Sequence, residues 1–147
     1  MTLDEALRVA VDAHAGKLDK AGKPYILHPV RVMMTVQGPD LESARKVAVL
    51  HDVVEDSEWT VQRLDEKFGL TPEEQAALGL LTHAHDDDYD AYVEKVATNP
   101  LATAVKVADL RDNLDVTRLE VVTERDAKRI SKYLRSLRRL TRDQARK

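Results

Sequence analysis

Helix-start signals recur along this chain, and they constrain its fold more than any other feature of the sequence. Thr2 and Glu5 have the spacing of a capping box, and apolar residues follow at helical intervals. Strand patterns are nearly absent. The sequence therefore predicts an all-α fold, a compact domain of roughly seven or eight helices. Further capping signals stand at Asp40, Thr71-Pro72, Asn99-Pro100 and Thr123, and the first of these should open a helix running from Leu41 through Val54.

Turn residues divide the chain into short helical segments without separating it into domains. They occur at 22–24, at 38–39 and at Gly69. The sequence shows no internal repeat, linker or low-complexity stretch. At 147 residues the chain has the usual length of one domain. We therefore expect one domain, residues 1–147.

Composition narrows the classes of function. A formal net charge of −3 and an aromatic content of 4% argue against a nucleic-acid-binding protein. The first residues carry acid where a secretory signal needs base, and no apolar run approaches the length of a membrane span. We expect a cytoplasmic protein with neither a nucleic-acid nor a membrane partner. Because there is no cysteine, a metal ion would have to bind through histidine and carboxylate side chains.

The last predicted helix combines an apolar stripe with many basic residues. Ile130, Leu134, Leu137 and Leu140 recur at helical spacing. One reading is a basic helix for nucleic acid or membrane, and the other is a core-facing stripe with a solvated cationic face. We favour the second, because the charge elsewhere is acidic.

The segment 50–56 is the most informative in the chain. An apolar run leads into His51 and Asp52, and the adjacent carboxylates Glu55 and Asp56 follow. Residues four apart share a helix face, so this segment would concentrate three carboxylates and an imidazole. Their repulsion costs free energy unless a cation is bound. A solvated acidic helix end is the alternative, but it does not account for the preceding apolar run.

Two further segments carry possible metal ligands. His28 precedes a proline, which places it at a helix entrance, although a packed or capping histidine is a simpler reading of that residue alone. Asp109 lies among apolar neighbours, with Asn113 four residues later. An ion pair with Lys106 or a nearby arginine could also explain Asp109. Together, two histidines and two aspartates make a plausible set of ligands for a divalent ion.

The order of these residues resembles the HD superfamily, and more narrowly the hydrolase domain of the RelA/SpoT alarmone enzymes and their small single-domain relatives. The resemblance extends from about Ala6 to Asn113. It is carried by the segments AHAGKLDKAGKPYILHP, AVLHDVVEDS and VKVADLRDN. It implies an HD-domain fold and a metal-dependent phosphohydrolase.

The resemblance also implies a role for each residue of the set. One divalent ion, typically manganese in this family, would be held by His28, His51, Asp52 and Asp109. Glu55 and Asp56 would position and activate the attacking water. Asn113 would contact the sugar of a small nucleotide substrate, and Lys20 would contact the nucleotide. The implied reaction removes the 3′-pyrophosphate from guanosine tetraphosphate or pentaphosphate.

Some positions depart from the family pattern. Asp19 stands where the family usually has an arginine that stacks on the guanine base, Lys17 replaces a common glutamine, and Val116 replaces a frequent hydroxyl residue. Two alternatives therefore stay open, a phosphohydrolase acting on a different nucleotide or phosphorylated cofactor, and a nucleotide sensor without turnover. The presence of both Glu55 and Asp56 speaks against the sensor.

The remaining histidines have simpler interpretations. His83 and His85, beside three aspartates, could share an ion in an extended loop, but we expect a solvated loop. His14 should be a packed, hydrogen-bonded histidine on the inner side of the first helix.

Overall fold

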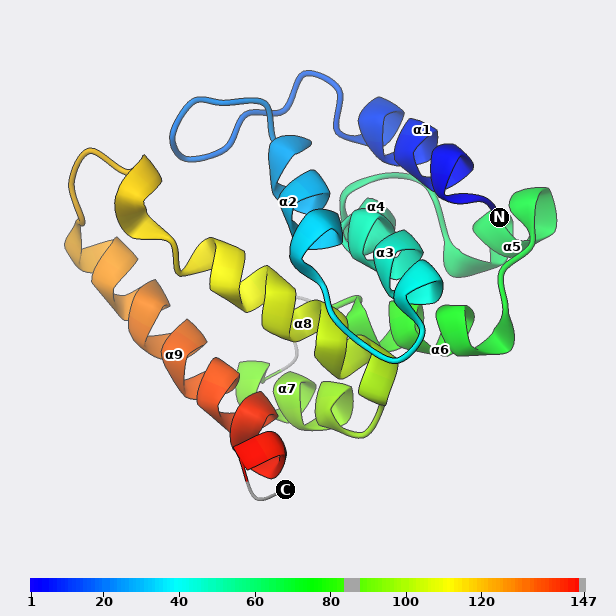
Figure 1. Ribbon diagram of the computed structural model, residues 1–147. Helices are drawn as coiled ribbons and strands as arrows, with labels where there is room; N and C mark the ends of the chain where they lie inside the picture. The colour runs from blue at the N-terminus through cyan, green and yellow to red at the C-terminus, as the bar shows by residue number, and fades with distance from the viewer. Residues whose placement is uncertain (84–87, 146–147) are drawn as a thin grey trace.

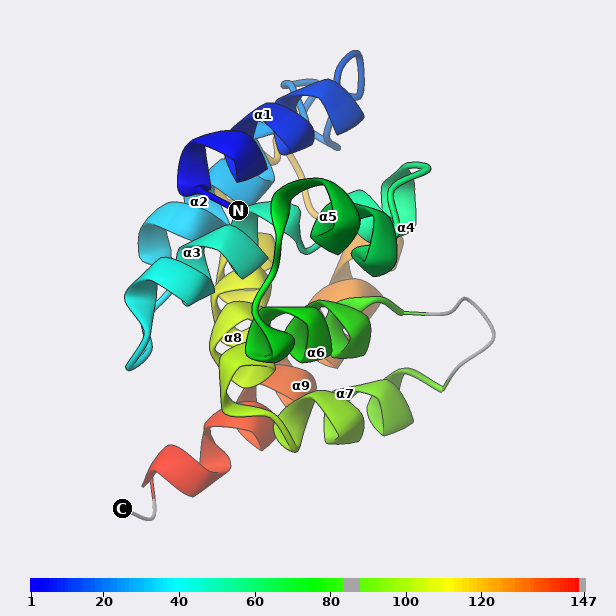
Figure 2. The same ribbon diagram turned by 90° about the vertical axis from the view of Figure 1, so that its right-hand side faces the viewer.

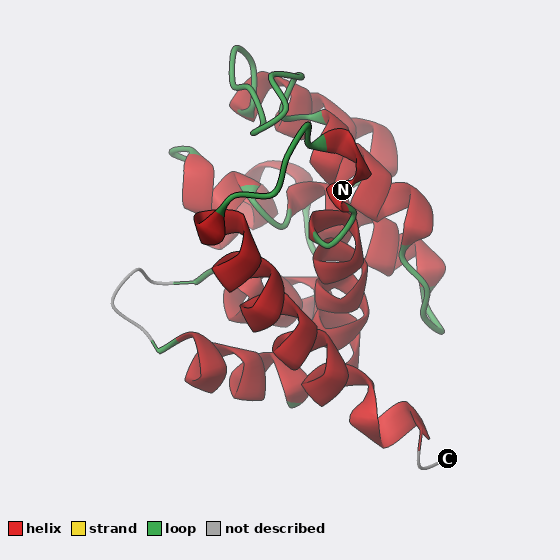
Figure 3. Cartoon of the chain, turned by 90° about the vertical axis from the view of Figure 1, so that its left-hand side faces the viewer, coloured by secondary structure: helices red, strands yellow, loops and turns green. Residues whose placement is uncertain are grey.

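A computed structural model describes residues 1–83 and 88–145 of the chain. These residues form helices joined by loops, together with one isolated antiparallel bridge between Leu18 and Pro24 (Figure 3). The prediction of an all-α fold is confirmed. The elements in chain order are α1 (Leu3–Ala13), α2 (Leu27–Thr35), α3 (Leu41–Leu50), α4 (Val53–Asp56), α5 (Val61–Phe68), α6 (Pro72–Leu81), α7 (Tyr89–Ala97), α8 (Pro100–Asn113), the 3₁₀ helix η1 (Val116–Arg118) and α9 (Glu124–Ala145).

Helix α8 runs through the middle of the molecule (Figure 1). It contacts α2 and α3 on one side and α6, α7 and α9 on the others. Helix α1 packs on α3 and α4 at one end of the molecule, and the end of α9 extends away from the other (Figure 2). Because α8 is surrounded, its side chains from Val105 to Leu110 are all buried. No helix among the described residues is long and apolar enough to cross a membrane.

The predicted helix starts are confirmed by their hydrogen bonds. Thr2 and Glu5 form the reciprocal capping box. The side chains of Asp40, Thr71 and Asn99 each accept a hydrogen bond from a backbone N–H in the first turn of α3, α6 and α8. Thr123 accepts from the backbone N–H of Asp126 in the same way. Local sequence therefore fixes where these helices begin.

The predicted helix from Leu41 through Val54 is broken. Helix α3 ends at Leu50, and the four-residue helix α4 begins only at Val53. At the break, Nδ1 of His51 donates to the backbone carbonyl of Ala48, a group that a continuing helix would bond to the N–H of residue 52. The side chain of His51 thus closes α3 and is itself fixed there.

The buried face of α9 differs by one residue from the predicted stripe. Leu140 is buried and Leu137 packs against the core, but Leu134 is 40% exposed. The inward positions are completed by Tyr133, which packs on the core, and by the buried Ser136. On its outer face, Arg135 and Arg139 form ion pairs with Asp90 and Glu94 of α7, so the basic residues serve helix packing.

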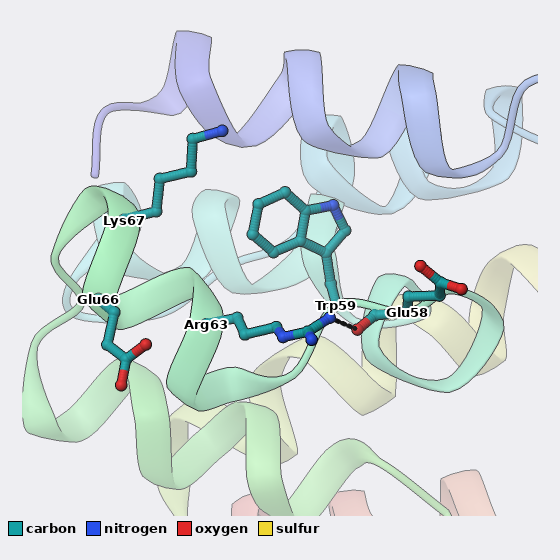
Figure 4. A pocket seen from close by; sticks show the side chains of 5 residues that line it. All are labelled: Glu58, Trp59, Arg63, Glu66 and Lys67. Carbon is teal, nitrogen blue, oxygen red and sulfur yellow. Dashed lines mark hydrogen bonds between the residues drawn. The ribbon is translucent and has the colours of Figure 1, made fainter.

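The loop between α4 and α5 is anchored by Trp59, whose ring lies 5.9 Å from that of Phe68. Figure 4 shows Trp59 with the side chains of α5 around it. Lys67 Nζ lies 5.6 Å from the centre of the indole, and Arg63 donates to the backbone carbonyl of Glu58. This anchoring fixes the chain directly after the Glu55-Asp56 pair.

Candidate metal centre

Three side chains from consecutive helices converge at the break between α3 and α4. His28 lies in the first turn of α2, His51 follows α3, and Asp52 is the next residue. One ligand atom from each lies within 4.8 Å of the other two. Both histidines are 5% exposed. This group is a candidate metal site in the part of the chain that the structure describes.

The Nδ1 atoms of His28 and His51 make their contacts on the side of each ring that faces away from the candidate metal position. Nδ1 of His51 donates to Ala48, and Nδ1 of His28 lies 2.7 Å from Oδ2 of Asp112. The two Nε2 atoms therefore face inward, as in metal sites where a carboxylate or carbonyl orients each histidine. Nε2 of His51 is buried and lies 3.1 Å from Oδ2 of Asp52, but no contact of it among the described residues has hydrogen-bond geometry. A nitrogen that faces carboxylates in this way is suited to coordinating a cation.

Asp109 supplies the second carboxylate from α8. Its Oδ1 lies 3.0 Å from Nε2 of His28 and 3.3 Å from Nε2 of His51. Its Oδ2 forms a 2.9 Å ion pair with Lys106, and Asn113 donates to Oδ1 over 3.1 Å. Asp109 can therefore be both an ion-pair partner and a metal ligand, since one of its oxygens pairs with Lys106 and the other faces the two histidines. The structure brings the four predicted ligands together.

The charges of the site compensate one another. Burial opposes the ionisation of Asp52, but His51 outweighs it and lowers the pKa of Asp52 to about 2. Burial likewise opposes the charge on Asp109, but Lys106 and His51 hold its pKa well below the ordinary value. Burial would lower the pKa of His51, yet Asp52 and Asp109 raise it well above the ordinary value. Two ionised carboxylates facing two imidazoles fit a divalent cation with nitrogen and oxygen ligands.

A pocket of about 270 Å³ opens onto these four residues. Glu55 lines it and accepts a hydrogen bond from the backbone N–H of His83. Burial raises the pKa of Glu55, although the hydrogen bond from His83 opposes that rise. Lys106, Tyr89 and Tyr92 also line it. Among the described residues, Glu55 is therefore the one carboxylate that lines this pocket in addition to the predicted metal ligands.

Asp56 does not line this pocket. Its carboxylate lies 3.9 Å from Nζ of Lys17, which also donates to the backbone carbonyl of Asp56. We expected Glu55 and Asp56 to lie on one surface with His51 and Asp52. Asp56 instead faces Lys17 in the loop after α1.

A second pocket, of about 330 Å³, adjoins the first and shares Tyr25, His28, Asn113 and Tyr133 with it. Lys20 lies in it, so both predicted substrate-contact residues, Lys20 and Asn113, line this region. The carboxylate of Asp19 accepts hydrogen bonds from the backbone N–H groups of Ala21 and Lys23. Asp19 thus closes the turn that carries Lys20.

Several residues of the site escaped the sequence reasoning. Asp112 contacts His28, and Arg31 binds Asp112 through two nitrogens. The hydroxyl of Tyr25 donates to Asp52. Arg31 stands three residues after His28, and Asp112 three residues after Asp109. That spacing, which places each pair on one helix face, was the available signal.

The other three histidines, His14, His83 and His85, are not among the predicted metal ligands. His14 is buried as predicted, but neither of its nitrogens has a hydrogen-bond partner among the described residues, so the expected hydrogen bonding is wrong. His83 lies in the loop after α6 and is partly exposed, while its ring packs 4.5 Å from that of Tyr92 and lines the first pocket. His85 lies outside the described residues.

The chain is similar in sequence to several known proteins. No family model matches it. A probable GTP pyrophosphokinase of Mycobacterium leprae is 31% identical over 127 residues, which cover 79% of this chain and 16% of that protein. The guanosine-3′,5′-bis(diphosphate) 3′-pyrophosphohydrolase of Aquifex aeolicus is 29% identical over 138 residues, 88% of this chain and 19% of that protein. The Vibrio cholerae protein of the same name is 46% identical over 71 residues, 44% of this chain and 10% of that protein.

The structural comparison covers more of the chain than these sequence matches do. A solved structure of a metazoan SpoT orthologue, described as hydrolysing ppGpp, superposes with a TM-score of 0.67. The match covers 97% of this chain and 94% of that one, at 22% identity. The chain shares the fold of this SpoT-type HD domain and resembles RelA/SpoT enzymes in sequence. It spans only 10% to 19% of the length of these three relatives.

Proposed function

We propose that this HD domain is a metal-dependent phosphohydrolase that removes the 3′-pyrophosphate from guanosine tetraphosphate or pentaphosphate. One observation carries the proposal, the convergence of two imidazole nitrogens and two ionised carboxylates beside Glu55 in one pocket. The names of the relatives support this choice of substrate. On this proposal residues 1–147 act as one hydrolase domain in the cytoplasm, on a small nucleotide.

The metal would be held by His28, His51, Asp52 and Asp109, and we expect manganese. When bound, such an ion lowers the pKa of a coordinated water and offsets the charge that develops on phosphoryl oxygens. The hydrogen bond from His51 to Ala48 and the contact of His28 with Asp112 keep both imidazoles turned toward this position. The hydroxyl of Tyr25 donates a hydrogen bond to Asp52 and so fixes the orientation of that carboxylate.

Glu55 would accept the proton of the attacking water. Desolvation in the pocket raises the pKa of Glu55 above its ordinary value, which makes the carboxylate a stronger base. The hydrogen bond from His83 fixes the carboxylate against the pocket wall. Asp56 would assist from outside the pocket, where Lys17 holds its carboxylate.

The substrate would extend from the metal centre into the second pocket. Asn113 borders both pockets, and we assign it to the sugar. Lys20, at the turn closed by Asp19, would contact the nucleotide. The cations of this pocket, which include Arg129 and Arg118, suit an anionic substrate.

Asp19 favours a second candidate function, hydrolysis of a different nucleotide or phosphorylated cofactor. Its carboxylate is bonded to two backbone N–H groups, so it neither stacks on a base nor offers the charge of the arginine found in the family. The metal centre would then act on a substrate whose base need not be guanine.

Manganese-dependent release of phosphate and pyrophosphate tests the proposal. Metal-stripped protein is resupplied with Mn²⁺ and given guanosine tetraphosphate beside a panel of other nucleotides. His51→Ala and Glu55→Ala serve as inactive controls. Pyrophosphate release from the alarmone, lost in both variants, supports the first function, whereas turnover of other substrates only supports the second. Metal binding without any turnover would contradict both and favour a nucleotide sensor.

A further inference from the structure

The carboxylate of Asp112 is surrounded by cationic side chains next to the metal centre. It is 10% exposed, and its Oδ2 lies 2.7 Å from Nδ1 of His28. Arg31 donates to both of its oxygens, over 2.8 Å and 3.1 Å. Arg118 lies 3.5 Å from Oδ2 and donates to the backbone carbonyl of the same residue. These contacts fix the orientation of the carboxylate.

Two parallel contacts join α2 to α8 here. His28 faces Asp109, and one helical turn further along, Arg31 faces Asp112. The contact between His28 and Asp112 crosses between these two pairs. Because each pair is one turn apart on its own helix, the register that brings His28 to Asp109 also brings Arg31 to Asp112.

The contact with Asp112 determines which nitrogen of His28 is free. A histidine that donates from Nδ1 to a carboxylate keeps the lone pair of Nε2 available for a metal ion. Without an acceptor at Nδ1, the ring could carry its proton on Nε2, which would then donate to Asp109. That hydrogen bond would occupy both ligands at once.

We propose that Asp112, held by Arg31, is a positioning residue that sets the affinity and geometry of the metal site by fixing the ring of His28. The inference rests on the proposed function, because it requires that His28 binds a metal ion.

The chain offers a matched control in Asp115. This aspartate lies three residues after Asp112 and forms a 3.1 Å ion pair with Arg118, but its side chain is 45% exposed and contacts neither histidine of the site. Asp115→Asn therefore removes the same charge from the same stretch of chain without disturbing His28.

Mn²⁺ affinity, measured by competition with a chelator, is the first readout. Asp112→Ala should raise the Kd by about 10–100-fold, the usual effect of removing a residue that orients a metal ligand. Asp112→Asn should raise it less, because the amide oxygen still accepts from Nδ1, and Asp115→Asn should leave it unchanged. If Asp112→Ala does not fold, Arg31→Met supplies the test, since it loosens the carboxylate while leaving it in place.

The visible spectrum of the Co²⁺-loaded protein is the second readout, because it reports the geometry of the ligands and not the stability of the fold. The proposal expects the spectrum to change in Asp112→Ala and to stay the same in Asp115→Asn. Equal Mn²⁺ affinity and an equal spectrum in wild type, Asp112→Ala and Arg31→Met would overturn it. A wild-type protein that binds neither ion would instead show that the metal site itself is wrong.

Discussion

Nζ of Lys106 lies 2.9 Å from Oδ2 of Asp109, on the side of the carboxylate that faces away from the two histidines. The lysine side chain is 11% exposed and the aspartate 6%. Lys106 also lies 5.2 Å from the ring centre of Tyr92 and 5.7 Å from that of Tyr89. A buried cation thus holds one oxygen of a proposed metal ligand while the other remains directed to the metal position.

Lys106→Met should destabilise the metal-free protein by about 3–5 kcal/mol, because removing one partner of a buried ion pair leaves the other charge uncompensated. Urea unfolding in the presence of a chelator measures this difference. Lys128→Met, at an exposed position of α9, is the control and should change stability by about 0.5 kcal/mol or less. Equal stability of the two variants would show that the buried charge of Asp109 does not need Lys106 to compensate it.

The two adjacent carboxylates Glu55 and Asp56 should differ in their effect on catalysis. Glu55→Gln should lower kcat by about 10²–10⁴-fold, the range expected for loss of a general base, and should leave Mn²⁺ affinity nearly unchanged. Asp56→Asn should have a smaller effect, because that side chain faces Lys17 outside the pocket. Steady-state kinetics on the best substrate of the panel decides the order. A larger loss in Asp56→Asn would show that Asp56, and not Glu55, is the general base.

Local chemistry explains how much of this molecule could be predicted from the sequence. The caps at Thr2, Asp40, Thr71 and Asn99 act within one turn, so the sequence alone locates those helix starts. The four proposed ligands were also recognisable, because each is an ionisable residue in an apolar or proline-fixed setting. Their convergence follows from the family resemblance and not from spacing, since α2, α3 and α8 meet only in the folded chain.

What could not be predicted depends on contacts between helices. The break after Leu50 arises because the side chain of His51 takes a backbone hydrogen bond, and a periodicity argument cannot detect this. The contact of Asp56 with Lys17 joins α4 to the loop after α1, which the sequence does not place side by side. Asp112 acquires its role only when α8 and α2 are in register.

Asp19 should stabilise the turn that carries Lys20, and it should not contact the base of the substrate. Asp19→Asn keeps an oxygen that can accept from the N–H groups of Ala21 and Lys23, so KM should change little. Asp19→Arg loses both hydrogen bonds and should raise KM by displacing Lys20, even though it restores the residue of the family pattern. Kinetics of the two variants on guanosine tetraphosphate provide the comparison. A marked fall in KM with Asp19→Arg would show that position 19 limits guanine recognition.

His14 should make the stability of the protein depend on pH. Burial lowers the pKa of His14 below its ordinary value of 6.5, although Asp52 and Asp56 partly oppose this, and Lys17 and His51 add to it. The unfolded chain therefore takes up the proton first as pH falls. The resulting stability is present above about pH 6.5 and is lost progressively as pH falls toward the lowered pKa of the folded state.

His14→Leu removes this dependence and also removes two buried nitrogens without hydrogen-bond partners. The variant should gain free energy of unfolding relative to wild type as the pH is lowered from about 7 to 5, the range in which an ordinary histidine titrates. Urea unfolding of both proteins in excess chelator keeps metal binding out of the comparison. The other histidines are common to both proteins, so the difference between the two curves isolates His14. Parallel curves over that pH range would mean that His14 has the same pKa in the folded and unfolded states.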